Sequence, residues 1–470
     1  MKSIFKQDVF EYPSLQEDIC CEYCIVGAGL AGISLAYLLK DYDVVLVDQQ
    51  GFMQASSSMN TGKLTAQHGA CYHRIIQKYG IDVAKQYYLD NEKALDLVKQ
   101  WHAQFPFTLT MCDTMLYAYK NTKELKKEYL AYQQLHIPSK LSKHYLYMLN
   151  QYQFHPIEVA KQLLTHNTRL RCYQNTQITN YTTTTPILLN ANTHKIQAHT
   201  VIFTNHSPTL FSEFLLFIRY KAYTSYILMK PYPFKKPFNI LSIDNDKTSL
   251  RTIEHNQQKY VLICKEDHRF GIPNHTAYQT IDNQTQRIAT TIHQQWQNHD
   301  YITHDLLPFI DEIHPNIFLT FGYNLWGNSW SIASGILLYD TIINKNNKLY
   351  PYRINRLKDY LTIPFLTTNL ETLYLYLKYY LLYFYKKTNG STIQFQNKTF
   401  GYYENKDYKY IIDIHCPHLG CILQYNSNTQ TWDCPCHASS FSQEGTRIAG
   451  PTSKSLQKIQ IITTNKISGM

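Results

Sequence analysis

Two short segments near the C-terminus each combine cysteine with histidine, residue types that bind transition metals. The first segment, HCPHLGC, contains Cys416, His418 and Cys421, and the second, CPCH, contains Cys434, Cys436 and His437. His418 follows Cys416 by two residues, and His437 follows Cys434 by three. If the two segments face each other, they offer one metal centre two thiolates and two imidazoles.

This ligand set suits a pair of sulfide-bridged irons. Cys416 and Cys434 would bind one iron and His418 and His437 the other, which is the ligand pattern of a Rieske [2Fe–2S] cluster. Because imidazoles replace two anionic thiolates, such clusters have potentials of about −150 to +300 mV, against roughly −400 mV in plant-type ferredoxins. Structural zinc is the alternative, but zinc sites usually present Cys-x2–4-Cys pairs rather than Cys-x-His with Cys-x2-His. The pattern predicts a chain that transfers single electrons.

Other residues of these segments would shape the cluster site. Cys421 and Cys436 occupy matching places in the two loops, and a disulfide between them would join the loops. Gly450–Pro451 would form a turn in a third, covering loop. Ser439 is placed to donate a hydrogen bond to a cluster sulfur, which would stabilise the reduced state.

A second candidate site lies near the N-terminus, in the glycine-rich run GAGLAG at residues 27–32. Apolar runs at 23–26 and 44–47 predict two strands, and the apolar run that follows Gly32 predicts a helix between them. A strand, a glycine turn, a helix and a second strand form the unit that binds dinucleotides, with the pyrophosphate at the helix N-terminus.

Each residue of this turn has a role in a dinucleotide site. Gly27, followed by Ala28, makes the tight turn, Gly29 lets the backbone approach the pyrophosphate, and Gly32 allows close helix packing. Asp48, at the end of the second strand, would bind the ribose hydroxyls. The N-terminal placement of the unit and the long polar loop after it favour FAD over NAD. A glycine-rich turn with no ligand is the alternative.

Elements along the rest of the chain must position these two sites. A length of 470 residues is enough for two or three domains. Apolar positions at helical spacing over 72–101 predict a helical segment, and alternating runs on both sides of Asn256-Gln257 predict a hairpin. Short strands are predicted at 201–204 and 317–320, and an all-β module is predicted after the linker at 387–390.

Charge and cysteine usage narrow the partners and the compartment. The formal charge is +10, but the basic residues are scattered and form no nucleic-acid motif, so no nucleic-acid partner is expected. The first residues lack the apolar region of a secretory signal. Of the eleven cysteines, the seven outside the metal-binding segments have no regular spacing, which favours a reducing, cytoplasmic compartment.

The most apolar stretch of the chain runs from Leu373 to Tyr385. It is too short to span a bilayer, which needs about 20 apolar residues, and Lys378 interrupts it. We expect a buried helix. Weak contact with a membrane surface is the less favoured alternative.

Taken together, the motifs resemble a D-amino-acid-oxidase-like FAD-dependent oxidoreductase fused to a C-terminal Rieske domain. Besides the glycine turn, the resemblance lies in GKLTAQHG (62–69), YHRIIQKYG (72–80), FHP (154–156), VIFTNH (201–206) and TFGYNLWGNSWSIASG (320–335). It implies an α/β FAD-binding Rossmann-like domain with an inserted α+β substrate domain, followed by a small all-β Rieske domain. It also places Ile178 and Thr204 near the adenine half of FAD, and Gly322, Trp326 and Gly327 near the flavin ring.

The resemblance implies a division of the chain into three parts. The oxidoreductase domain covers 1–358, the aromatic helix and linker 359–389, and the Rieske domain 390–470. Within the first part, nucleotide-binding segments lie at about 20–70, 150–215 and 305–345, and substrate-binding segments at about 72–150 and 216–304.

The C-terminal part resembles the disulfide-containing Rieske branch of cytochrome bc-type proteins, which implies a bond between Cys421 and Cys436. Ala438 stands where that branch usually has glycine, and Phe441 stands where a tyrosine often donates its hydroxyl to a cysteine sulfur. Loss of that donor should lower the reduction potential.

No catalytic residue can be assigned from the sequence, although several are candidates. Arg251 could bind a carboxylate and Tyr226 lies on a predicted substrate-domain strand, but structural roles are favoured for both. His68 lies near the flavin ring or caps a turn. A polar, helix-like, solvated segment, rather than a metal site, is expected for His293, His299 and His304.

The leading hypothesis is a flavin and iron–sulfur oxidoreductase with a small-molecule substrate, such as an amine or amino acid. The substrate gives a hydride to FAD, and single electrons pass through the Rieske centre to an external acceptor. A Rieske-type oxygenase would need a 2-His-1-carboxylate iron site, and no such constellation is found. The remaining alternative is a non-enzymatic redox sensor or electron-transfer module with a vestigial substrate pocket.

Overall fold

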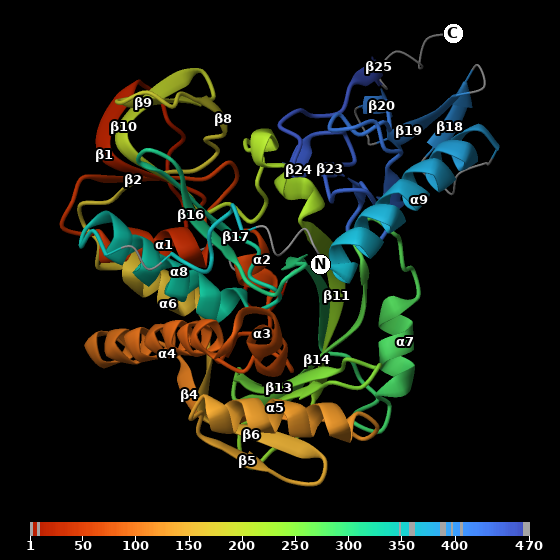
Figure 1. Cartoon of the computed structure of the whole chain (residues 1–470). Coiled ribbons are helices and arrows are strands. Elements are labelled where there is room, and N and C mark those ends of the chain that lie inside the picture. The colour runs from red at the N-terminus through yellow and green to blue at the C-terminus, as the bar shows by residue number, and fades with distance from the viewer. Residues whose placement is uncertain are drawn as a thin grey trace.

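The computed structural model describes residues 3–6, 10–346, 349–356, 362–385, 392–395, 398–404 and 408–463. Four β-sheets organise these residues: a largely parallel sheet, a large mixed sheet and two small sheets near the C-terminus. In Figure 1 the parallel sheet lies at the upper left, the large sheet below it, and the small sheets, in blue, at the upper right. The mixed α/β body and the small C-terminal sheets confirm the predicted fold class.

The parallel sheet contains the predicted dinucleotide unit. Its strand order is β16 (Phe309–His314), β17 (Ile317–Phe321), β10 (His194–Phe203), β1 (Ile19–Val26), β2 (Val44–Val47) and β7 (Arg171–Tyr173). A short antiparallel extension from β10 consists of β9 (Ile187–Ala191) and β8 (Ile178–Tyr181). The parallel pairing of β2, β1, β10 and β17 brings the carboxyl ends of these strands to one edge. Ligands of open α/β sheets bind at that edge.

Three helices cover one side of the parallel sheet: α1 (Leu30–Leu38), α6 (Pro156–Thr165) and α8 (Gly327–Ile342) (Figure 1). The helix α1 contacts both of the others. All residues of α1 from Leu30 to Tyr37 are buried, and the buried core on this side includes Leu35, Leu337 and Leu338. The apolar helix predicted between the first two strands is therefore a core helix, which fixes the position of the glycine turn before it.

The large sheet lies below the parallel sheet in Figure 1. Its strands run in the order β15 (Gln294–Thr303), β11 (Tyr220–Pro231), β14 (Gln258–Arg269), β13 (Ser249–His255), β12 (Asn239–Ser242), β4 (Leu109–Tyr117), β6 (Tyr145–Phe154) and β3 (Lys63–Leu64), with β5 (Ser139–Leu141) paired to β6. The remaining helices of the body are α2 (Ser56–Met59), α3 (Tyr72–Tyr79), α4 (Ile81–Gln104), α5 (Thr122–Gln134) and α7 (Ala277–Gln284).

Two sequence predictions for this region can be compared with the structure. The hairpin is confirmed: β13 and β14 are antiparallel, and His255 pairs with Gln258 across Asn256-Gln257. The helical segment over 72–101 is two helices rather than one, because Gly80 ends α3 with a positive φ of 92°. Glycine adopts this conformation without steric cost.

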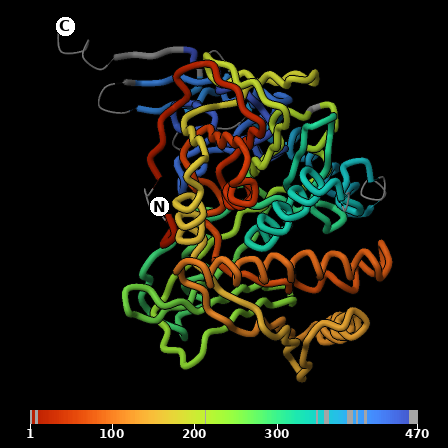
Figure 2. Tube along the Cα trace, turned by 90° about the vertical axis from the view of Figure 1, so that its left-hand side faces the viewer, coloured from red at the N-terminus to blue at the C-terminus, as the bar shows by residue number. Residues whose placement is uncertain are grey.

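The C-terminal part begins with a long helix, α9 (Ile363–Tyr385), and continues in two small sheets. One sheet contains β18 (Thr392–Phe395), β19 (Lys398–Glu404), β20 (Tyr408–Ile412) and β25 (Lys458–Thr463). The other contains β21 (Gln424–Asn426), β22 (Thr431–Asp433), β23 (Ser440–Ser442) and β24 (Arg447–Ala449). The views of Figures 1 and 2 both place this part beside the parallel sheet and far from α5.

The structure changes two details of the predicted aromatic helix. The helix begins ten residues earlier than Leu373, at Ile363, and it is buried on one side only. Tyr383 is 4% exposed and belongs to the core of the C-terminal part, whereas Tyr374 is 60% exposed. The expectation of a buried helix is therefore wrong for the outer face, because an isolated apolar run does not reveal how many sides a neighbour covers. None of the helices in the described ranges has both the length and the apolar character needed to cross a bilayer.

Candidate functional site

A cavity of about 510 Å³ opens where the carboxyl ends of the parallel strands meet the large sheet and the C-terminal part. This volume lies in the range of small-molecule sites, roughly 300–1,000 Å³. Of the residues predicted to contact FAD, seven line it: Gly27, Ala28, Gly29, Asp48, Thr204, Gly322 and Gly327. Trp326 also lines it.

The glycines let the turn pack closely, because larger side chains at these positions would collide with the protein. A Cβ on Gly27 would lie 3.0 Å from Thr204 Oγ1, and a Cβ on Gly32 would lie 1.9 Å from Gly27 O. Gly32 thus permits close packing of α1 on the turn, and it is not among the residues lining the cavity. The helix α1 has neither a side-chain cap nor an acidic residue in its first turn. The N–H of Leu30 donates to Ser57 Oγ of the loop after Asp48, and an anionic pyrophosphate fits the rest of this N-terminus.

Asp48 follows β2 at the cavity wall. Its carboxylate accepts hydrogen bonds from the backbone N–H groups of Ala28 and Gln50, both at 2.8 Å. Burial raises the pKa of Asp48, and these two bonds oppose the rise. The carboxylate is fixed beside the turn, where ribose hydroxyls would reach it.

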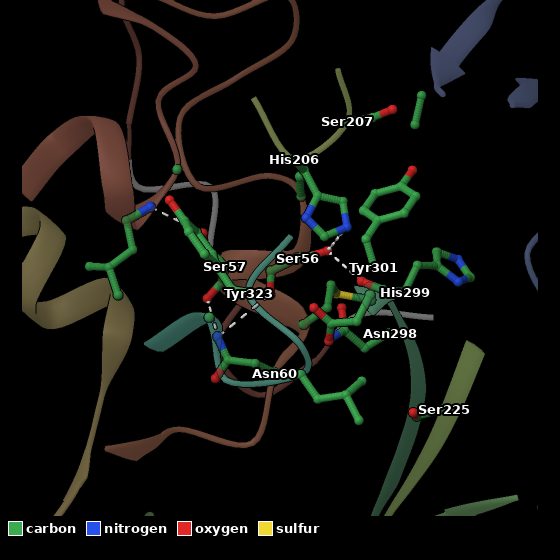
Figure 3. Close-up of a pocket in the computed structure, with 18 of the residues that line it drawn as sticks. Ser56, Ser57, Asn60, His206, Ser207, Ser225, Asn298, His299, Tyr301 and Tyr323 are labelled. Carbon is green, nitrogen blue, oxygen red and sulfur yellow. Dashed lines mark hydrogen bonds between the residues drawn. The ribbon is translucent and has the colours of Figure 1, made fainter. Parts of the chain in front are cut away.

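The long loop after Asp48 supplies the next part of the wall, which Figure 3 shows. Ser56 donates a hydrogen bond to His299 O at 2.9 Å and lies 3.1 Å from His206 Nε2. Ser57 accepts a hydrogen bond from the N–H of Leu30 at 3.0 Å. Burial lowers the pKa of His206 to about 4 and that of His299 to about 3, so both imidazoles are neutral.

Lys63 is a cavity residue that sequence reasoning missed, although it lies within the GKLTAQHG run. Its ammonium donates to Ile240 O at 3.0 Å and to Ser249 Oγ at 2.6 Å. Burial lowers the pKa of Lys63 to about 7. A buried lysine with this pKa can hold or release a proton near neutral pH.

The second site lies in the C-terminal part, where two loops bring the predicted metal ligands together. Cys416 and Cys434 are close enough to share a hydrogen bond, which lowers the pKa of Cys416 to about 7 and raises that of Cys434. The rings of His418 and His437 have centroids 5.1 Å apart. Burial lowers the pKa of both histidines, which favours the neutral rings that metal ligation requires.

The disulfide and the covering loop complete this site. Cys421 and Cys436 are bonded to each other. Their sulfurs lie within 4.8 Å of the sulfur of Cys434, but disulfide sulfurs have no thiolate to offer a metal. A Cβ on Gly450 would lie 2.2 Å from the Cα of Ser439, so the third loop approaches the site closely. The donor set fits a [2Fe–2S] cluster held by two thiolates and two imidazoles.

The oxidoreductase body contacts the cluster loops directly. The ring of Phe217 meets His418 and His437 edge-on, with centroids 4.7 and 5.0 Å apart. Buried Arg269 donates hydrogen bonds to Pro435 O at 2.9 Å and to Cys436 O at 3.0 Å. The C-terminal part therefore meets the body through the two loops that carry the metal-binding residues.

The same C-terminal part closes one side of the cavity. Ala438, Ser440 and Arg447 line it together with the glycine turn. Arg447 donates to Gln49 Oε1, and Gln49 donates to Ile448 O at 3.0 Å. The C-terminal part that carries the cluster loops thus also forms part of the cavity wall.

Several residues singled out in the sequence lie outside the cavity wall. His68 is buried and neutral, contacts Tyr87 and Ser329, and stacks on Trp326 at 4.8 Å. The hydroxyl of Tyr226 is hydrogen-bonded to the ring of His268 on the neighbouring strand β14. Ile178 is in the hydrophobic core. These residues support the wall rather than form it.

The structure also bears on the carboxylate-binding role considered for Arg251 and on the metal site considered for the three histidines. The guanidinium of Arg251 donates to the backbone oxygens of Thr61 and Phe154, which supports the structural role. The helix-like, solvated segment is wrong for His299, which lies on β15 and lines the cavity. His304 is buried and His293 is exposed, and in the described ranges the three form no metal-binding group. The alternating pattern of β15 is masked by its polar residues.

Comparison with known proteins matches two families to two different parts of the chain. The family model described as FAD dependent oxidoreductase (DAO) matches residues 22–341, and the Rieske [2Fe-2S] domain model matches residues 387–460. A Bacillus subtilis protein named as a Rieske 2Fe-2S iron-sulfur protein, YhfW, is 28% identical over 97% of this chain and 96% of its own length. The cytochrome b6-f complex iron-sulfur subunit of Microcystis aeruginosa is 40% identical over 10% of this chain and 26% of that subunit.

Solved structures share the fold of the body. Glycine oxidase from Geobacillus kaustophilus superimposes with a TM-score of 0.59 at 14% identity, over 72% of this chain and 99% of that one. L-amino acid deaminase from Proteus vulgaris gives 0.57 at 12% identity, over 74% and 99%. Because its family model covers more than half of the sequence, the chain belongs to the FAD-dependent oxidoreductase family, carries a C-terminal Rieske domain, and is an oxidoreductase that uses FAD and a [2Fe–2S] cluster.

Proposed function

We propose that this oxidoreductase takes a hydride from a small substrate, such as an amine or amino acid, and passes single electrons to an external acceptor. The chemistry supplied by the bound groups is hydride acceptance by FAD and one-electron transfer by the Rieske centre. The observation that carries the proposal is the shared cavity wall. Residues of the glycine turn and of the Rieske part, including Gly29 and Ala438, line one cavity.

The residues proposed for each group follow from the positions described above. We propose Cys416, His418, Cys434 and His437 as the cluster ligands. For FAD we propose contacts from Gly27, Ala28, Gly29, Asp48, Thr204, Gly322 and Gly327, with Gly32 and Ile178 packed behind the cavity wall. The proposed division is 1–358 for the oxidoreductase domain, 359–389 for the helix and linker, and 390–470 for the Rieske domain.

Buried aromatic residues lie where the two sites approach each other. Tyr220 and Tyr301 are buried, and their ring centroids lie 4.6 Å apart. Tyr301 lines the cavity, whereas the pKa of Tyr220 is raised by burial, by Tyr301 and by nearby Cys434. These rings lie between the cavity and the cluster loops. Buried rings in this position support electron transfer within one chain.

Anaerobic stopped-flow spectroscopy tests the proposal. The flavin is reduced chemically or by substrate, and absorbance at flavin and cluster wavelengths is followed separately. We expect the cluster to be reduced after the flavin, at a rate at least equal to turnover with an artificial acceptor. If the reduced flavin leaves the cluster oxidised on that timescale, the electron path is wrong.

A further inference from the structure

The large sheet presents two carboxylates to the cavity, and neither the glycine turn nor the cluster uses them. Asp267 lies on β14 and Asp300 on β15, and both line the cavity. Between these strands runs β11, on which Ser225 pairs with Asn298 and Tyr223 pairs with Asp300. Directly paired residues share one face of a sheet, so Ser225, Asn298 and Asp300 face the same side. Figure 3 shows Asn298 and Ser225 on this part of the wall.

Neither carboxylate is held in an ion pair, although the charge of Lys247 acts on Asp267. Among the residues in the described ranges, no Lys, Arg or His forms an ion pair with Asp267 or Asp300. Burial raises the pKa of Asp300 to about 7, and the charge of Asp267 contributes. Burial also raises the pKa of Asp267, while Ser225, Lys247 and His268 oppose the rise and Glu266 adds to it.

Two neighbouring acceptors have no donor. Asn298 is 9% exposed and Gln297 is 5% exposed, and the side-chain oxygens of both lack a hydrogen-bond partner among the described residues. Both residues line the cavity, but successive residues of a strand face opposite sides, so of the two it is Asn298 that shares the face of Asp300. The amide nitrogen of Asn298 donates to Asp300 at 3.1 Å, so its oxygen Oδ1 remains available. Buried acceptors without donors are costly, which indicates that a ligand with several N–H donors belongs here.

The same region offers little to a substrate carboxylate. Arg251 donates to the backbone oxygens of Thr61 and Phe154, and the ammonium of Lys63 is bonded to Ile240 O and Ser249 Oγ. Both buried cations already have acceptors. Lys6, Lys247 and Arg447 also line the cavity; Arg447 already donates to Gln49 and Thr209, and Lys247 is exposed to solvent. The wall near Asp300 thus favours a cationic group and has no free buried guanidinium for an anionic one.

We propose that Asp267, Asp300 and Asn298 form a binding subsite for the ammonium group of a simple amine that has no carboxylate. An ammonium has three donors, and two carboxylates with an amide oxygen supply matching acceptors. This inference rests on the proposed function, because it names the substrate class of the same cavity. It separates the chain from enzymes that require a zwitterionic amino acid.

Matched ligands test the subsite by binding alone. Propylamine, 1-propanol and 2-aminobutyrate differ only in charged groups, and benzylamine, benzyl alcohol and phenylglycine form a second such set. Binding to the FAD-loaded, full-length protein is measured anaerobically from the flavin difference spectrum. We expect at least one amine to bind at least tenfold more tightly than its matched alcohol and its matched amino acid. Absence of that preference in both sets overturns the proposal.

Conservative variants locate the preference. Asp300→Asn keeps the shape of the side chain and removes its charge, so we expect it to weaken binding of the preferred amine at least tenfold and to leave alcohol binding unchanged. Asp267→Asn should act in the same direction. The control is Asp311→Asn, whose carboxylate accepts a hydrogen bond from Ile354 N and lies outside the cavity wall. An equal effect of Asp311→Asn, or no effect of Asp300→Asn, overturns the proposal.

The pH dependence of amine affinity is an independent test of Asp300. Alkylamines stay protonated between pH 5 and 8, whereas Asp300 gains a proton as the pH falls through about 7. Amine affinity should therefore decrease toward pH 5, by up to about tenfold per pH unit. A flat profile in this range contradicts the role of Asp300.

Protein stability supplies a readout that needs no ligand. The pKa of Asp300 is higher in the folded chain than in the unfolded one, so between about pH 4 and 7 the unfolded chain binds fewer protons. Wild-type stability thus decreases as the pH rises through this window. We expect Asp300→Asn to raise the melting temperature by about 2 °C at pH 8 and to have a smaller effect at pH 5. A lower melting temperature at pH 8 contradicts a buried carboxylate held for a ligand.

Failure of the subsite and failure of the proposed function give different results. If amines bind through Asp300 but never reduce the flavin, the subsite stands and the proposed function fails. If 2-aminobutyrate reduces the flavin equally well in wild type and in Asp300→Asn, the function stands and the subsite is wrong.

Discussion

The residues that sequence reasoning identified are those whose chemistry is local in the chain. The residues of the Cys–His segments and of the glycine turn lie at short, characteristic separations along the sequence, so the cluster site and Asp48 could be found without a structure. Asp267 and Asp300 could not, because a single aspartate is unremarkable and only strand pairing places both on one wall. Ala438 shows the limit of motif comparison: its φ of 63° explains why glycine is usual there, but not why this chain keeps alanine.

Ser439 offers a prediction at the residue scale. It is fully buried, its hydroxyl has no other partner in the described part of the chain, and it contributes to lowering the pKa of Cys416. Removing a donor near a cluster sulfur destabilises the more negative, reduced state. We expect Ser439→Ala to lower the cluster potential by about 40 mV, taking a hydrogen bond as about 1 kcal/mol.

An EPR-monitored redox titration measures this shift. Ser442→Ala is the control, because Ser442 donates to Glu444 at 2.7 Å on the outer side of its strand. Its potential should equal that of wild type. An unchanged potential in Ser439→Ala would mean that the hydroxyl does not reach the cluster sulfurs.

At the scale of elements, strong apolar runs predicted β1, β2, β10, β17 and the helix α1 of the parallel sheet, and weaker patterns were missed. β2 matches its predicted range and the β13–β14 hairpin is present, whereas β1 begins four residues earlier than predicted. The strand β15 was missed because its run QQWQNHDYIT is polar on both faces, one of which lines a cavity. A functional wall weakens the hydrophobic alternation on which strand prediction depends.

The two faces of α9 give a matched prediction. Tyr383 is 4% exposed and contacts His415 with ring centroids 5.0 Å apart, whereas Tyr374 is 60% exposed. Replacing a large buried aromatic residue by alanine costs about 3–5 kcal/mol, and exposed substitutions usually stay within about 0.5 kcal/mol.

We therefore expect Tyr383→Ala to lower the stability of the Rieske part strongly and Tyr374→Ala to change it little. Urea unfolding followed by cluster absorbance measures both variants. Equal losses would show that the outer face of the helix is covered in solution.

At the scale of the whole molecule, the contact between the two functional parts is what no sequence pattern indicated. Gln49 and Arg447 are 398 residues apart and hydrogen-bonded, and Phe217 reaches the histidines of the cluster loops. Each contact joins residues that have no periodicity or motif in common. The sequence could therefore predict two redox modules, but not that one module would close the cavity of the other.

Arg269 holds these modules together and gives the last prediction. Its guanidinium is 3.1 Å from Glu371 of α9 and donates to the backbone oxygens of Pro435 and Cys436. Replacing it leaves buried acceptors unpaired, at a cost of about 3 kcal/mol. We expect Arg269→Gln to slow flavin-to-cluster electron transfer at least tenfold in stopped-flow experiments, while flavin reduction by substrate keeps its wild-type rate. Arg171→Gln, which removes a surface arginine that donates to Cys20 O and Asp43, should leave both rates unchanged. If Arg269→Gln also transfers electrons at the wild-type rate, the docked arrangement is not the one through which the cluster is reduced.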